Sequence, residues 1–578
     1  MRLGNRKFSI AGLVVLLGTI ALLATACGGT ASTGPGDKAK DQTLRLGWST
    51  GGGSADITTL DPAQCSDTSC GPIVALLFDG LVTLDKNLNV VPEGAKNWTV
   101  SSDGLTYTFN LQANQKFSDG TPVKPSDYAW SMERSLNPCV GSPVSYYLSG
   151  AGSELIKDSQ KFAGETCTNG QVTGAIPTLI GDSIIPDDSA NTLTVKLAAP
   201  AAFFLAAMTY STSFAIEKSA VTGADLGKDG TWMDNLVKGA TGQGGSGMFY
   251  ISAWDHKGVL NLKPNPNYWG KKPTFTEIDF KLFESSDTEY STYQTDQTLA
   301  YTDTIPAAQL AAAKGQPDYH ALPILGFGGF AMNWKIAPFD DLNARKAFCL
   351  AINRDQWNSS VAKGADIPGW HIVPKGMPGY NANLKGIDGA PSTGDVNAAK
   401  TYWAKYLAAH NNKVPPIKLS FNLSSNTAKL SAEFYQSTWN QAFNANVTID
   451  QTAWQTILKE EQQKTVQIYR FGWLADYPDP QDFLTLLFTT TSGYNENNAS
   501  IPAADQLMTQ ADGLASMSQR VPLYNQAEQM IVDQVGFCPV FQYQNYYRQR
   551  TWLKGGFDQT SQAVWPLSAW QSGYVANH

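Results

Sequence analysis

The pattern of apolar and polar positions is most regular in the C-terminal half of the chain. It predicts strands at residues 417–423, 447–450 and 466–471, separated by helices at residues 427–443 and 455–464. An order of strand, helix, strand, helix and strand is typical of an α/β sheet with helices on its faces. We therefore expect a layered α/β fold, in which ligands bind at the carboxyl ends of the strands.

The N-terminal half has shorter elements. Period-two alternation predicts a strand at residues 106–111, and Ser126 and Asp127 are candidate caps of the helix that follows. Further strands are predicted at residues 191–197 and 248–254. No internal repeat is visible, which disfavours a solenoid or a propeller.

The first residues combine a basic start with an apolar run. Arg2, Arg6 and Lys7 precede an almost unbroken apolar segment at residues 10–25, which ends in small residues. This combination is typical of a secretory signal peptide, which we place at residues 1–26. The alternative is a permanent membrane anchor, but the segment is shorter than the ~20 residues that a spanning helix prefers.

The end of this apolar segment resembles a bacterial lipobox, because small residues lie directly before Cys27. The resemblance implies that Cys27 is lipidated and becomes the mature N-terminus. Residues 30–42 are small, polar and broken by Gly and Pro, so residues 27–42 are assigned to the lipidated cysteine and a flexible tether. We expect an exported protein on the outer face of the bacterial cytoplasmic membrane, in contact with the bilayer through its anchor only.

The six remaining cysteines form an even set in a chain that is predicted to be exported, so disulfides are expected. Proximity in sequence suggests three pairs: Cys65–Cys70, Cys139–Cys167 and, by remainder, Cys349–Cys538. A zinc site is the alternative. It is disfavoured because the sequence has no CxxC and its five His do not cluster with the cysteines, so no metal is predicted.

Composition narrows the classes of function. Apolar residues make up 42% of the chain and charged residues 16%, which is enough apolar material for large cores. The net charge of −8 becomes −11 when the three basic residues of the leader are removed, and no basic run appears. A nucleic-acid partner is therefore not expected. The 16 Trp, 23 Tyr and 25 Phe are a supply of side chains suited to lining a pocket.

Common enzyme motifs are missing from the sequence, including the P-loop, HExxH and G-x-S-x-G. The single GxGxxG match, which begins at Gly242, precedes a predicted strand and is interpreted as a glycine-rich turn. Asp479 and Asp482 belong to a proline-containing turn and are assigned turn and cap roles. We predict a protein that is not an enzyme and needs no cofactor.

A set of short motifs follows in order over residues 43–570. These motifs are residues 59–62, 77–81, 107–111, 117–123, 246–250, 262–269, Asn333, 338–341 and 345–354. Together they resemble the oligopeptide- and dipeptide-binding lipoproteins of ABC importers. The resemblance implies an α/β, two-lobed fold like that of periplasmic binding proteins, with a hinge, an extra subdomain on the first lobe and the ligand held between the lobes.

The resemblance also implies how the chain is divided. Lobe I would comprise residues 43–78, 208–322 and 541–578. The extra subdomain would comprise residues 79–207, and lobe II residues 323–540.

One segment, with the sequence RFGWLADY, resembles the part of oligopeptide binders that carries an aspartate for the peptide's α-ammonium group. It implies that Asp476 binds the ammonium, that Arg470 binds the peptide carboxylate at some lengths, and that Trp473 forms a pocket wall. The alternatives are a turn or cap role for Asp476, an ion pair within a lobe for Arg470, and core packing for Trp473. Phe330 and Asn333 are further candidate contacts, and two glycines before Phe330 suggest a close approach of the backbone to the hinge or the ligand. For Phe330 the favoured alternative is core packing.

The leading prediction is the monomeric, substrate-binding component of an ABC import system. It would capture extracellular oligopeptides between its lobes and deliver them to the transmembrane permease subunits, which work with cytoplasmic ATPase subunits. One alternative is the same fold with a different solute, such as a dipeptide, an opine, a glycoside or a metal chelate. Another is a peptide-sensing receptor without transport.

Overall fold

The computed structural model describes residues 37–578 except 51–53, 152, 424 and 558–564. The predicted signal peptide, Cys27 and most of the tether lie outside the described residues. Within the described part, no helix is both long enough and apolar enough to cross a membrane. The terms lobe I, lobe II and extra subdomain are used below for the residue ranges given above.

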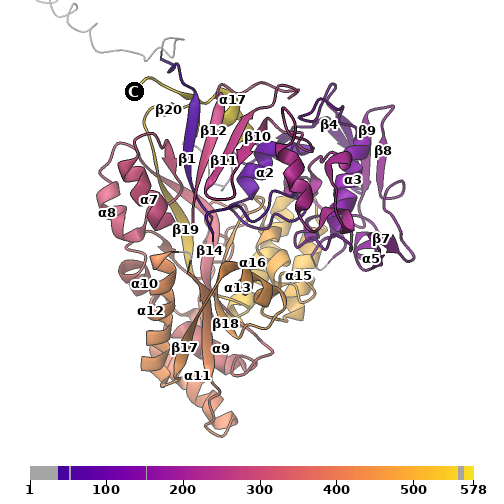
Figure 1. Cartoon of the computed structure of the whole chain (residues 1–578). Helices are drawn as coiled ribbons and strands as arrows, with labels where there is room; N and C mark the ends of the chain where they lie inside the picture. The colour runs from indigo at the N-terminus through magenta and orange to yellow at the C-terminus, as the bar shows by residue number, and fades with distance from the viewer. Residues whose placement is uncertain (1–36, 51–53, 152, 424, 558–564) are drawn as a thin grey trace, which may run out of the picture.

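One mixed sheet runs through both lobes (Figure 1). Its strand order is β10-β11-β12-β1-β13-β19-β14-β18-β16-β17, and β15 pairs with β19. The strands are β1 (Thr43–Ser49), β10 (Phe249–Trp254), β11 (Val259–Pro264), β12 (Glu277–Phe283), β13 (Tyr301–Thr302), β14 (Tyr319–Met332), β15 (Ile367–Pro368), β16 (Ile417–Asn422), β17 (Val447–Thr452), β18 (Ile468–Leu474) and β19 (Cys538–Gln549).

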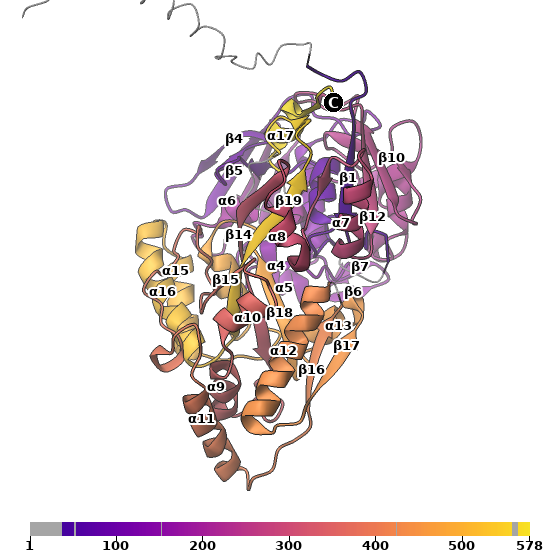
Figure 2. The same cartoon turned by 90° about the vertical axis from the view of Figure 1, so that its left-hand side faces the viewer.

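The long strands β14 and β19 join the two lobes. They pair antiparallel along the middle of the molecule, and Figure 2 shows them side by side there. Their register shifts twice, between residues 323 and 327 and between residues 328 and 329, so the ladder has three separately paired parts. A Cβ atom at Gly329 would collide with the carbonyl oxygen of Cys538, so this glycine serves close contact between the two strands.

The predicted elements of lobe II are confirmed within one to three residues at their ends. Helices cover its part of the sheet: α9 (Leu342–Leu350), α10 (Arg354–Ser360), α11 (Val396–Ala409), α12 (Asn426–Phe443), α13 (Trp454–Gln462), α14 (Thr485–Phe488), α15 (Pro502–Asp512) and α16 (Met517–Asp533). Capping explains one of the boundaries. The side chain of Ser425 accepts a hydrogen bond from the backbone N–H of Ala428 and so begins α12.

The extra subdomain has its own antiparallel sheet in the order β4 (Ala95–Val100), β5 (Thr106–Leu111), β9 (Thr192–Lys196) and β8 (Ile184–Asp187). It packs against α3 (Pro125–Leu136). The predicted capping of α3 needs correction. Lys124 is the N-cap residue, and Asp127 acts from inside the first turn by accepting its backbone N–H at 2.8 Å. Ser126 donates instead to Asp188, because a proline already begins the helix at position 125.

All three predicted disulfides are present: Cys65–Cys70, Cys139–Cys167 and Cys349–Cys538. The third one connects α9 to the start of β19, two elements that are 189 residues apart in sequence. No group of His, Cys, Asp and Glu suited to holding a metal ion occurs among the described residues.

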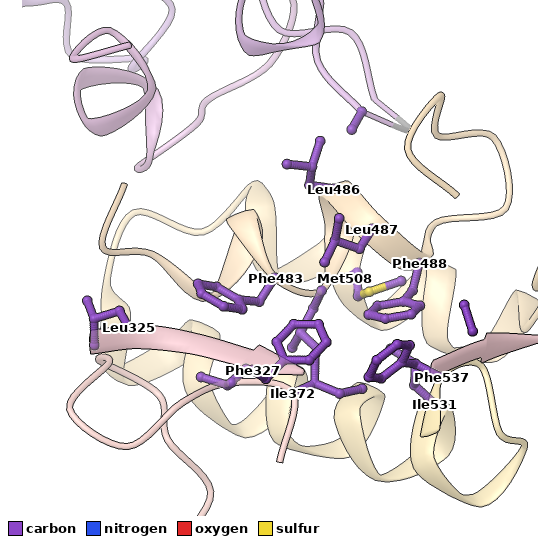
Figure 3. Close-up of a cluster of buried hydrophobic side chains, with 14 of the residues drawn as sticks. Leu325, Phe327, Ile372, Phe483, Leu486, Leu487, Phe488, Met508, Ile531 and Phe537 are labelled. Carbon is purple, nitrogen blue, oxygen red and sulfur yellow. The ribbon is translucent and has the colours of Figure 1, made fainter. Parts of the chain in front are cut away.

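Two large hydrophobic clusters form the core. One belongs to lobe I, and the other continues from the extra subdomain into lobe II. Figure 3 shows a part of the second cluster, where Phe483 on the loop after β18 meets Phe327 on β14 at a ring distance of 6.0 Å. The extra subdomain and lobe II are therefore in apolar contact in this conformation.

Candidate functional site

The candidate site lies where the loop after β18 meets the extra subdomain. β18 pairs with β14 on one side, and its carboxyl end leads directly into Ala475 and Asp476. The subdomain contributes the short helix α4 (Tyr146–Ser149). A strand end opposite another unit is the place at which ligands gather in α/β sheets.

Asp476 links the two sides of this junction. One of its carboxylate oxygens, Oδ2, accepts a hydrogen bond from the hydroxyl of Tyr147 on α4, and its backbone N–H donates to Asp482 Oδ2 at 3.0 Å. Burial raises the pKa of the Asp476 carboxyl well above its usual range. Asp476 thus lies at the interface between lobe II and the extra subdomain, and Tyr147 is its hydrogen-bond partner there.

Asp482 lies beneath the same loop and is fully buried. Its Oδ2 atom accepts from the Asp476 backbone and from the Trp473 indole Nε1 at 3.3 Å, whereas its Oδ1 atom has no hydrogen-bond partner among the described residues. Burial, and secondarily the neighbouring Asp476, raise the pKa of Asp482 well above the ordinary value. Asp482 lies in the predicted turn, but Asp479 is the cap residue there, and the Asp482 side chain instead stabilises the loop that carries Asp476.

Asp479, three residues before Asp482, is stabilised in a different way. Its side chain accepts from the backbone N–H of Gln481, which confirms its predicted cap role. It also forms a buried two-point ion pair with Arg520 of α16, at 2.6 and 2.7 Å. Among the described residues, no Lys, Arg or His forms an ion pair with Asp476 or Asp482.

Aromatic rings surround the two carboxyl groups. Tyr147 stacks on Tyr210 at a ring distance of 3.9 Å and meets Tyr477 edge-on at 5.9 Å. Tyr146 lies against Tyr494 at 4.3 Å. Rings from the extra subdomain, from Tyr210 and from lobe II thus converge on the carboxyl groups of Asp476 and Asp482, which together are called the acidic site below. Both aromatic ring faces and carboxylates favour the binding of a cation.

Trp473 and Arg470 occupy opposite faces of β18, because they are three residues apart in a strand. Trp473 is half-buried, lies edge-on to Tyr494 at 5.3 Å and donates to Asp482, so it belongs to the acidic site. Arg470 instead adjoins Asp366 and Tyr543. Burial raises the pKa of Asp366 to about 7, and the positive charge of Arg470 opposes this shift.

Phe330 and Asn333 lie in the interior of lobe II and not at the site. Phe330 is fully buried against Tyr435 and Trp439, at ring distances of 5.2 and 5.0 Å. The side-chain amide of Asn333 donates to the backbone oxygens of Lys464 and Val466. Their predicted ligand contacts are therefore not seen, because both side chains are enclosed by lobe II. Phe330 packs in the core, and Asn333 binds backbone oxygens.

Comparison with known proteins identifies the class. The family model described as bacterial extracellular solute-binding proteins, family 5 (middle) matches residues 89–495, which is more than half of the chain. The chain therefore belongs to this family of solute-binding proteins. The prediction of a binding protein instead of an enzyme is confirmed by this membership, and the family is an extracellular one.

The relatives are similar over nearly their whole length. The oligopeptide-binding protein OppA of Bacillus subtilis is 26% identical over 95% of this chain and 97% of its own. The periplasmic murein peptide-binding protein MppA of Escherichia coli is 28% identical over 86% and 88%. A solved structure of the Escherichia coli murein tripeptide binding protein MppA matches with a TM-score of 0.79 and 23% identity, over 94% of this chain and all of that one. This likeness confirms the predicted two-lobed α/β fold.

Proposed function

We propose that the protein is the substrate-binding component of an ABC importer and captures oligopeptides between its lobes. The observation that carries this proposal is the acidic site at the carboxyl end of β18, where the fully buried Asp482 and the partly buried Asp476 have no cationic partner among the described residues. Relatives named as peptide-binding proteins support the same class of ligand.

In this proposal Asp476 binds the α-ammonium group of the peptide, and Trp473 with the surrounding tyrosines forms the wall around it. A desolvated pair of ammonium and carboxylate is strong and selective in geometry. The rest of an extended peptide would be held by main-chain hydrogen bonds, which do not depend on side-chain identity. Arg470 is left out of this subsite, because it lies across β18 beside Asp366.

The proposed mechanism is closure around the ligand. The paired strands β14 and β19 are proposed as part of the hinge, since the predicted boundaries at 322/323 and 540/541 both fall within them. A peptide that contacts both sides stabilises the closed form by its differential affinity. We further propose a monomer that is lipidated at Cys27, docks on the transmembrane permease subunits and leaves ATP hydrolysis to cytoplasmic subunits.

Two measurements test the class of ligand. Native mass spectrometry of protein purified without denaturation is expected to show a retained peptide, and calorimetry is expected to show binding of free tri- to pentapeptides. N-acetylated versions of the same peptides are expected to bind far more weakly, because acetylation removes the cation that Asp476 would pair with. Equal affinity for free and acetylated peptides, or retention of a sugar or a metal chelate instead, would contradict the proposal.

Tyr147→Phe is expected to increase the affinity for free peptides by about 3- to 10-fold. The Tyr147 hydroxyl donates to the carboxylate oxygen that the ammonium needs, and a neutral hydrogen bond has a net value of about 0.5–1.5 kcal/mol. Removal of the hydroxyl therefore removes a competitor for Asp476. Calorimetry on wild type and variant measures the change. Weaker binding in the variant would show that the hydroxyl stays in the complex as an additional partner.

A further inference from the structure

The acidic site holds one more carboxyl group than a single ligand ammonium needs. We propose that Asp482 is a second carboxyl group of the cation subsite, and that ligand capture exchanges a proton held by the Asp476–Asp482 pair for the cation of the ligand. This inference rests on the proposed function and adds a binding residue and a coupling between ligand and proton.

The geometry places the two carboxyl groups in one structural unit. Asp482 accepts the backbone N–H of Asp476 and the indole N–H of Trp473 through Oδ2, and these two bonds hold the loop in place. The other oxygen, Oδ1, is buried and has no partner among the described residues. A buried carboxylate oxygen without a partner is costly, and a bound cation or a proton would relieve this cost.

The neighbouring Asp479 shows what the site lacks. Asp479 accepts two hydrogen bonds from the buried guanidinium group of Arg520. Asp476 and Asp482 accept hydrogen bonds from neutral donors only: a tyrosine hydroxyl for Asp476, and a backbone N–H and an indole for Asp482. The charge of Asp476 acts on the buried Asp482, and two interacting carboxylates in a desolvated site without a cation do not both ionise. The unliganded pair therefore keeps a proton at neutral pH, in agreement with the raised pKa of both groups.

The other titratable groups around the pair leave this argument intact. Tyrosines face the pair from the extra subdomain, from Tyr210 and from lobe II. The other titratable groups around it are the Asp479–Arg520 ion pair and two further acids. The full set is Tyr146, Tyr147, Tyr210, Tyr477, Tyr494, Asp479, Arg520, Glu496 and Asp512. Burial raises the pKa of Tyr146, Tyr210, Tyr477 and Tyr494, so these four remain neutral. Burial also raises the pKa of Glu496 to about 8 and of Asp512 to about 7.

The exchange balances in charge and in protons. Before binding, the pair has one carboxylic acid and one carboxylate, and the ligand brings a protonated ammonium. After binding, the ammonium lies between two carboxylates, and the displaced proton passes to the solvent. The O–H of Tyr147 keeps its proton throughout, and no bond other than the carboxyl O–H is broken.

The sign of the pH dependence follows from this exchange. Each group has its pKa raised in the unliganded protein, and the ammonium lowers it in the complex, so protons leave on binding. Affinity for a free tripeptide is therefore expected to rise with pH by up to about tenfold per unit, from just above the ordinary carboxyl range upward. The rise ends where the unliganded pair, or the amine of the peptide, loses its own proton.

The experiment is isothermal titration calorimetry of the whole exported protein with a free tripeptide at pH 7, in buffers with different ionisation enthalpies. Release of about one proton per peptide is expected for the wild type. Asp482→Asn keeps an acceptor for the Asp476 N–H and the Trp473 indole but removes the charge, and it is expected to abolish most of the release. Glu289→Gln changes a buried acid pair of lobe I and serves as the matched control, with wild-type release expected.

The outcomes separate this inference from the proposed function. Binding with an enthalpy independent of buffer in the wild type would overturn proton exchange while leaving peptide capture intact. Wild-type release in a folded Asp482→Asn variant would overturn the role of Asp482. If that variant does not fold, the N-acetylated tripeptide decides, since release that persists without the ligand's cation contradicts the exchange. Absence of binding by any free peptide would overturn both.

Discussion

Replacing Asp476 with Asn is expected to weaken the binding of a free tripeptide by about 2–5 kcal/mol, roughly 30-fold to several-thousand-fold in Kd. The substitution keeps the size of the side chain and an oxygen that accepts from Tyr147, but it removes the charge that would pair with the ammonium. The ammonium would then be desolvated at the junction of lobe II and the extra subdomain without a counter-charge, and most of the loss arises from this penalty. Calorimetry on the purified variant measures the effect.

Two controls make the Asp476→Asn result specific. An N-acetylated tripeptide has no ammonium, so its weak affinity is expected to be nearly the same for wild type and variant. Asp450→Asn changes an acid of the same lobe whose partner, Lys418, is exposed, and it is expected to leave peptide affinity at the wild-type value. A folded Asp476→Asn protein that binds the free tripeptide within twofold of wild type would refute the ammonium role.

Arg134→Met is expected to lower the free energy of unfolding by about 3–5 kcal/mol. Arg134, on α3 of the extra subdomain, is 1% exposed and donates to both oxygens of Asp61 at 2.8 and 2.6 Å. The Trp232 indole also donates to Asp61, at 3.0 Å. Methionine fills much of the space but leaves a buried carboxylate without its cation, which is the costly part of breaking such a pair. Urea denaturation followed by fluorescence provides the measurement.

The double variant Arg134→Met with Asp61→Asn tests the reason for this loss. Neutralising the stranded carboxylate is expected to recover part of the stability lost by Arg134→Met alone, since two neutral groups cost less than one unpaired charge. Lys161→Met removes an exposed partner of Asp158 and is expected to leave the free energy of unfolding almost unchanged. Equal losses for Arg134→Met and Lys161→Met would mean that the buried pair contributes no more than a surface pair.

Local patterns predicted the elements of lobe II and the disulfides for physical reasons. Side-chain period and caps such as Ser425 are local properties, so the strand at 417–422 and the helix at 426–443 appear where the pattern indicates. The helix α3 was harder to predict. A proline at its first position moved the cap to Lys124, and Ser126 found a partner in Asp188, which is 62 residues away.

The site was predicted only in part. Asp476 and Trp473 come from one short segment whose resemblance could be recognised, and the structure places them together. Asp482 follows a proline-rich turn and has the local signature of a cap, so nothing in its neighbourhood predicted a buried carboxyl group. Tyr147 lies 329 residues before Asp476, and the only signal in its own segment was the pair of adjacent tyrosines.

The sequence by itself determined the layered α/β class, the disulfide pairs and the segment that carries Asp476, because each depends on residues close together in the chain or on the even number of cysteines. Only the tertiary structure decided which charges have partners. Asp61 and Asp479 receive buried guanidinium groups, whereas Asp476 and Asp482 receive none among the described residues. Burial and charge pairing depend on elements that are far apart in sequence. The acidic site therefore exists only because lobe II packs against the extra subdomain.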